Sequence, residues 1–66
     1  MKMYDLMFSV TETLQNGNER TKTVSVYSPS NDAVHIMKAT ALLREQKHYY
    51  KISYLHSAYR EILMID

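Results

Sequence analysis

Three histidines and seven carboxylates are the side chains that could carry acid–base catalysis or hold a metal ion. The histidines, His35, His48 and His56, stand 13 and 8 positions apart, and the chain contains no Cys. No two histidines have the four-residue spacing that places two imidazoles on one face of a helix. The sequence therefore predicts no metal site and no cofactor.

A nucleophile activated by a neighbouring base is the next chemistry to consider. Ser57 follows His56 directly, but adjacent residues of a strand point to opposite faces, so the hydroxyl and the imidazole would not meet. A phosphate-binding loop needs several glycines, whereas the chain has only Gly17. The carboxylates fit solvated or helix-capping positions. We therefore expect no catalytic residues and a protein that is not an enzyme.

Residues 44–51, which we call the basic–aromatic segment, interleave positive charges with two tyrosines. Proteins that bind single-stranded nucleic acids combine such charges, which neutralise phosphates, with rings that stack on bases. A solvated helix end explains the same residues, because Lys47 and His48 suit the negative end of a helix. On that interpretation Tyr50 belongs to the core and Lys51 to the outer face of a strand. Nucleic-acid binding is therefore the alternative function.

Aromatic and apolar residues exceed the number that a small core can use. The chain has six Tyr, one Phe and five Met, and Tyr and Met are favoured at protein interfaces. Four consecutive apolar residues at 62–65 favour self-association, and a homodimer is the expected assembly if no other partner is bound. The residues that we expect to bind a protein or nucleoprotein partner are Leu42, Arg44, Lys47, His48, Tyr49, Lys51, Leu55 and Tyr59.

Two strands and a turn precede these residues. Apolar residues alternate with polar ones from Tyr4 to Val10, which is typical of a strand buried on one face. A second strand is expected over residues 19–27. A two-residue Asn-Gly turn would place the valines of the second strand on the wrong face. A three-residue loop of residues 15–17, with Gly17 in a left-handed conformation, corrects this. The predicted cross-strand pairs are Phe8 with Val24, Leu6 with Val26, and Glu12 with Arg20.

A helix is expected next. In the segment 28–32, Ser28 or Ser30 can cap the free amides, Pro29 suits the first turn, and Asp32 complements the positive helix end. The helix should run to about Lys47. Its predicted sheet-facing stripe consists of Ala33, Val34, Ile36, Met37, Thr40, Ala41 and Leu43, with Leu42 on the opposite side.

The remainder of the chain returns to the sheet. Tyr50, Ile52 and Tyr54 are expected to share one face of a third strand, followed by a turn at 56–58. Residues 59–65 are predicted to form a fourth strand, with a short C-terminal helix as the alternative. The expected fold is α+β: a single domain over residues 1–66, with element order ββαββ and one helix on one face of an antiparallel sheet.

Length, charge and composition limit the cellular context. Sixty-six residues form a thin core, and a net charge of +1 does not by itself indicate nucleic acid or membrane. No stretch reaches the roughly 18 apolar residues of a membrane span, and Asp5 interrupts any signal-like run at the N-terminus. The absence of Cys favours a reducing compartment. We therefore expect a cytoplasmic protein without a membrane partner.

In length and element order the chain resembles small phage-encoded inhibitor proteins such as anti-CRISPR proteins. The resemblance covers the whole chain at the level of architecture, and the strand sequence 4–10 and the cap-and-helix sequence 28–33 are of general types that supply no family motif. The resemblance implies a compact protein, in the host cytoplasm, that docks on a host effector and occludes its nucleic-acid channel or a moving surface. It assigns no individual functional residue. The expected function is thus a non-enzymatic inhibitor, with a nucleic-acid-binding regulator or a dimeric accessory protein as alternatives.

Overall fold

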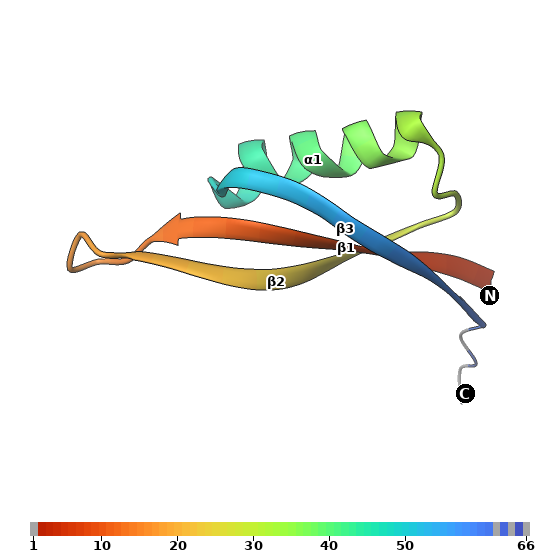
Figure 1. Ribbon diagram of the computed structural model, residues 1–66. Helices are drawn as coiled ribbons and strands as arrows, with labels where there is room; N and C mark the ends of the chain where they lie inside the picture. The colour runs from red at the N-terminus through yellow and green to blue at the C-terminus, as the bar shows by residue number, and fades with distance from the viewer. Residues whose placement is uncertain (1, 62, 64, 66) are drawn as a thin grey trace.

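A three-stranded antiparallel sheet carries one helix on one face (Figure 1). The computed structural model describes residues 2–61 together with 63 and 65. Its elements are β1 (Lys2–Thr13), β2 (Glu19–Ser28), α1 (Ala33–Lys47) and β3 (Tyr50–Glu61), and the strand order is β2-β1-β3. This confirms the predicted α+β class. No helix in the described residues is long and apolar enough to cross a membrane.

The β1–β2 hairpin has the predicted loop. The Leu14 N–H donates to the Asn18 carbonyl at 2.7 Å, and the Gly17 N–H donates to the Leu14 carbonyl at 2.9 Å. Gly17 has φ 85°, a conformation that glycine adopts without steric cost. The pairing is unbroken from Tyr4 to Thr13. The predicted pairs Leu6–Val26, Phe8–Val24 and Glu12–Arg20 are all confirmed.

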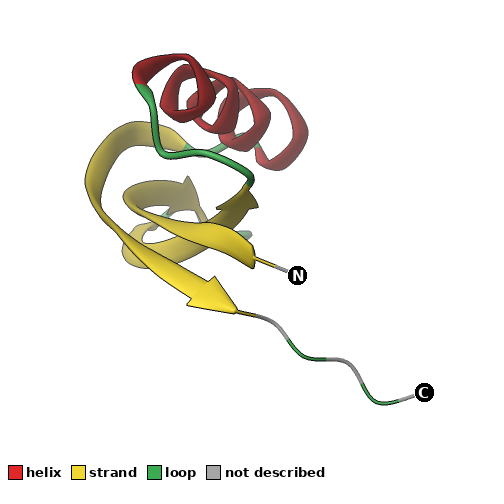
Figure 2. Ribbon diagram, turned by 90° about the vertical axis from the view of Figure 1, so that its right-hand side faces the viewer, coloured by secondary structure: helices red, strands yellow, loops and turns green. Residues whose placement is uncertain are grey.

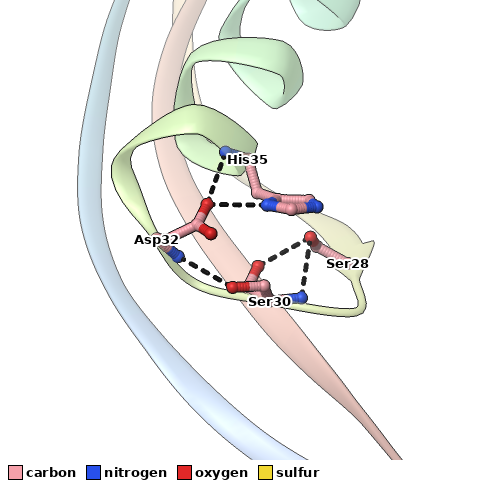
Figure 3. Close-up of polar contacts among 4 residues, drawn as sticks. All are labelled: Ser28, Ser30, Asp32 and His35. Carbon is pink, nitrogen blue, oxygen red and sulfur yellow. Dashed lines mark hydrogen bonds and ion pairs between the residues drawn. The ribbon is translucent and has the colours of Figure 1, made fainter.

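The start of α1 differs in detail from the prediction. Asp32 is the N-cap, and its Oδ1 accepts from the His35 backbone N–H at 2.9 Å (Figure 3). The two serines stabilise the preceding loop instead, because the Ser30 Oγ accepts from the Asp32 N–H and the Ser28 Oγ donates to the Ser30 carbonyl. The prediction that a serine caps the helix was wrong. Pro29 correspondingly lies before the first helical turn.

The core lies between α1 and one face of the sheet. Leu6, Phe8 and Val10 of β1 are fully buried there, beneath Ala39 and Leu43 of α1. The predicted helix stripe was too broad, because Val34 is 56% exposed and Met37 71% exposed. A helix touches a sheet of only three strands along a narrow line, so residues at the margin of its apolar stripe stay in solvent.

β3 is one continuous strand, and this corrects the prediction of a turn at 56–58 and a fourth strand from residue 59. It pairs with β1 from the Lys2–Glu61 pair to the Thr11–Tyr50 pair, so the observed order is ββαβ. A turn at 56–58 would leave the first half of β1 without backbone partners on this side. Residues 62 and 64 of the predicted fourth strand lie outside the described residues.

Two register shifts decide which way the side chains of β3 point. They lie between Met7 and Phe8 and between Ser9 and Thr11 of β1, and at each one β3 contains an extra residue. Tyr54 pairs with Phe8 and therefore faces α1, whereas Tyr50 pairs with Thr11 on the other face. The prediction that Tyr50 shares a face with Tyr54 was therefore wrong.

Candidate functional site

The predicted partner-binding residues are divided among three places on the molecule. The basic–aromatic segment covers the end of α1 and the start of β3, and contributes Arg44, Lys47, His48, Tyr49 and Lys51. Leu55 and Tyr59 lie further along β3. Leu42 lines a hollow between α1 and β2. The fold therefore does not gather them into one site.

Both tyrosines of the basic–aromatic segment have structural contacts. Tyr49 packs against the core, and the Lys22 Nζ lies 4.9 Å from its ring centroid. The Tyr50 hydroxyl donates to the Glu19 Oε1 at 2.9 Å and lies 3.0 Å from the Thr13 Oγ1. These rings therefore connect β3 to the hairpin, and the predicted interleaving of charges with freely presented rings is not formed.

The charges around the far end of the hairpin are partly paired. Arg20 and Lys22 both form ion pairs with Glu12, and their hydrogen bonds hold the pKa of Glu12 below its ordinary value. Contact with Tyr49, and then with Glu12, raises the pKa of Lys22. The Lys51 Nζ lies 3.7 Å from the Glu19 Oε2. Within the described part of the chain, exposed Arg44, Lys47 and His48 form no ion pair.

The conformation at the end of α1 is unusual for its residue types. His48 ends the helix in the left-handed region, with φ 59°, and Lys51 has φ 50° at the second register shift of β3. Both are positions where glycine is the least strained residue. The chain thus reverses direction at some conformational cost, and the exposed side chains of Arg44, Lys47 and His48 lie at this reversal.

The second place is the β3 edge surface, which we define as Tyr54, Leu55 and Tyr59. Their exposed fractions are 38%, 49% and 58%. The ring centroids of Tyr59 and Tyr4 lie 5.0 Å apart, and those of Tyr54 and Phe8 lie 5.6 Å apart. Contact with β1 on one side therefore holds the two rings while they remain open to solvent.

The third place is the α1–β2 hollow, which exists because α1 lies closer to β3 than to β2. Figure 2 shows the helix above a curved sheet, with the loop that precedes the helix passing between them. The hollow has a volume of about 160 Å³. Its lining residues are Val26, Tyr27, Ser28, Pro29, His35, Lys38, Ala39 and Leu42. Periodicity did not predict this hollow, because the position of a helix across a sheet depends on packing.

Asp5 is a residue that the alternation pattern assigned only to the polar face. It is buried on the sheet face away from α1, and its Oδ2 accepts from the Arg60 Nε at 3.2 Å. Its Oδ1 is buried without a hydrogen-bond partner among the described residues. Asp5 therefore connects two strand ends that lie 55 positions apart in the sequence.

The histidines remain far from one another in the fold. The His35 Nδ1 lies 2.6 Å from the Asp32 Oδ1 (Figure 3), His48 caps the end of α1, and His56 pairs with Met7 on the far face of the sheet. Across the described residues, no three His, Cys, Asp or Glu side chains are grouped so that they could hold a metal ion. No protein-family model, curated protein or solved structure matches this chain.

Proposed function

We propose that this chain is a small non-enzymatic interaction protein that binds a macromolecular effector and occludes part of its surface. The observation that carries this proposal is the β3 edge surface. β3 is a 12-residue strand at the edge of the sheet, and its aromatic and apolar side chains remain exposed. Exposed aromatic residues on a free strand are features that partner binding uses.

Edge strands carry unpaired backbone N–H and C=O groups, and proteins usually protect them with charges, proline or a covering element. The two register shifts interrupt the free edge of β3 near Lys51 and Leu55, but from His56 to Glu61 its pairing with β1 is unbroken. The exposed middle of β3 contains Tyr54 and Leu55, with Tyr59 nearer its end. A partner can add a strand to such an edge through backbone hydrogen bonds, while side-chain pockets give specificity. Tyrosine is also enriched among residues that dominate binding energy. The resemblance to phage-encoded inhibitors supports occlusion as the mode of action.

The alternative is nucleic-acid binding by the end of α1. The observation in its favour is that Arg44, Lys47 and His48 are exposed and unpaired within the described residues. The engagement of Tyr49 and Tyr50 in the fold weakens this alternative, because base stacking needs accessible rings. Affinity for a labelled single-stranded oligonucleotide, measured across salt concentrations, tests it. A phosphate-binding protein loses affinity steeply as salt rises.

A photo-crosslinking residue at Leu55 tests the main proposal in cells of the organism that encodes the chain. We expect one defined protein adduct, identified by mass spectrometry and competed away by excess wild-type protein. The matched control carries the same residue at Glu45, an exposed position on α1, and should give no such adduct. Equal adducts at both positions, or none at Leu55, would contradict the proposal. Leu55→Lys and Tyr59→Lys should each remove the adduct when the crosslinker stands at Tyr54.

A further inference from the structure

The α1–β2 hollow has the size and lining of a socket for one apolar side chain. An engineered apolar cavity of about 150 Å³ accepts benzene, and this hollow measures about 160 Å³. Val26, Ala39 and Leu42 supply apolar lining, while Lys38 and His35 add basic groups. Lys38 makes no ion pair with any described residue. The socket therefore suits an apolar side chain that is followed or preceded by a carboxylate.

An open strand edge borders this socket. β2 pairs with β1 on one side, and no other strand among the described residues pairs with it on the other. Every second residue of such an edge strand directs its N–H and C=O away from the sheet. An extended segment can therefore form backbone hydrogen bonds with β2 while placing alternate side chains towards α1.

The same chain contains a segment with the complementary chemistry. Residues 61–66 read Glu-Ile-Leu-Met-Ile-Asp, an apolar run with an acid at each end and no cation. Leu63 is 84% exposed and Ile65 is fully exposed. In an extended segment these two side chains point to the same face. Lys38 in the lining of the socket and Glu61 at the start of this segment have opposite charge.

We propose that residues 61–66 of a second copy of the chain add to the edge of β2 and place Leu63 or Ile65 in the α1–β2 hollow. Glu61 of that copy, on the same face of the extended segment as Leu63 and Ile65, then faces Lys38. β3 and β2 lie on opposite sides of β1, so the end of β3 at Glu61 is separated by β1 from the hollow of its own chain. A neighbouring copy can supply residues 61–66 directly, and reciprocal exchange closes a dimer.

This inference goes beyond the proposed function, because it uses β2 and the hollow and not the β3 edge surface. Sedimentation equilibrium of the full chain at micromolar concentrations should show a dimer. Leu42→Glu blocks the hollow, and Ile65→Lys alters the inserted segment. Each change should weaken the dimer by roughly 10-fold or more, as expected for the loss of one buried apolar side chain. The matched control is Val34→Glu, an exposed apolar position on α1 outside the hollow, which should remain dimeric.

Mixing the two weakened variants gives the decisive result. The Leu42→Glu chain keeps an intact C-terminal segment and the Ile65→Lys chain keeps an intact hollow, so an equimolar mixture should restore a heterodimer through one interface. A Leu42→Glu chain that dimerises like wild type would overturn the proposal and indicate contact between two C-terminal segments. A monomeric wild type, or a mixture that stays monomeric, would also overturn it. Circular dichroism of each variant separates these outcomes from unfolding.

The charge arrangement provides a second test. Lys38→Glu should weaken the dimer, and combining it with Glu61→Lys should restore part of the lost affinity. Leu55→Lys should leave the dimer intact while removing the adduct of the β3 edge surface, so the failure of one proposal can be distinguished from the failure of the other. If Lys38→Glu does not weaken the dimer and adding Glu61→Lys gives no recovery, the Glu61 carboxylate does not face Lys38.

Discussion

β2 and β3 flank the same central strand, but they are attached to it in different ways. β2 follows β1 through a three-residue loop, and its pairing with β1 runs without interruption from Tyr4 to Thr13. β3 returns after a 15-residue helix and pairs with β1 through two register shifts. At the left-handed positions, the hairpin uses Gly17 whereas the return to β3 uses His48 and Lys51.

The difference shows what a short connection contributes. A tight turn determines the register of its strands by geometry, and one slip would move every apolar side chain to the wrong face. A strand that follows a helix has no such constraint, so its register depends on how the helix packs. The extra residue of β3 at the shift between Met7 and Phe8 lets Tyr59 and Tyr54 both contact β1 on the side of α1, although they are five positions apart in the sequence.

Phe8→Ala should have the largest effect, because this side chain belongs to the strand that both edges share. Phe8 is fully buried and pairs with Val24 on one side and with Tyr54 on the other. Its truncation should cost about 3–5 kcal/mol, which is comparable to the whole stability that a core of this size supplies. Thermal melting followed by circular dichroism should find the variant largely unfolded. Tyr54→Ala, at a half-exposed position, should keep its fold, and equal losses would contradict this distinction between the centre and the edge.

Gly17→Val should selectively weaken the hairpin. A Cβ at this position would meet no atom within 4 Å, so the cost comes from the backbone conformation and not from a clash. A β-branched residue at φ 85° should lower the free energy of unfolding by more than about 1 kcal/mol, as measured by urea denaturation. The control is Gly17→Asn, which tolerates the left-handed region better and should cost less. An unchanged midpoint for the valine variant would show that the loop can close in another conformation.

Particular residues show how far sequence reasoning reached. The parity of Phe8 and Val24 determined the loop length, and from it the register of ten residue pairs. Parity could not predict where β3 ends, because Ser57 and Ala58 are compatible with a turn. Only the backbone groups of β1 that would otherwise lack partners on this side require β3 to continue to Glu61. Asp5 was placed on the correct face, but burial of its carboxylate beside Arg60 depends on a contact between distant strand ends.

The candidate sites also contain some features that the sequence could predict and others that depend on contacts between distant elements. Leu55 and Tyr59 were predicted to be exposed and are exposed, because they exceed what a small core can cover. The contacts of Tyr49 and Tyr50 could not be predicted, since they require the turn after α1 and the shift at Lys51. The hollow at Leu42 depends on the lateral position of the helix, which no periodicity encodes.

Lys51→Gly should stabilise the protein, because it places in β3 the residue type that the hairpin already uses at its left-handed position. The change removes a left-handed lysine, while its ion pair with Glu19 is exposed and contributes little. We expect a gain of up to about 1 kcal/mol in the free energy of unfolding. Lys51→Ala keeps the backbone strain and loses the ion pair, so it should not stabilise the protein. If the glycine variant is no more stable than the alanine variant, the left-handed conformation at this position carries no strain.

The smallest expected effect concerns acid, and it compares the loop before α1 with the hairpin. The backbone N–H of His35, and then its side chain, hold the pKa of Asp32 below its ordinary value of 3.8. Arg20 and Lys22 likewise hold the pKa of Glu12 below 4.5. Because both values are lowered by folding, each carboxylate contributes stability that is present above its ordinary pKa and lost as the pH falls through the folded value.

Urea denaturation between about pH 5 and about pH 2 can assign this loss to one region or the other. Asn caps a helix about as well as Asp but carries no titrating proton. Asp32→Asn should therefore keep α1 intact and remove the part of the acid-dependent loss that belongs to the helix connection. Glu12→Gln should remove the part that belongs to the hairpin, at the cost of its ion pairs at neutral pH. Asp32 is exposed and Glu12 is partly exposed, so each change should be small and should shrink further in high salt. An acid profile that Asp32→Asn leaves unaltered would mean that the cap of α1 acts as a hydrogen-bond acceptor whose charge is irrelevant to stability.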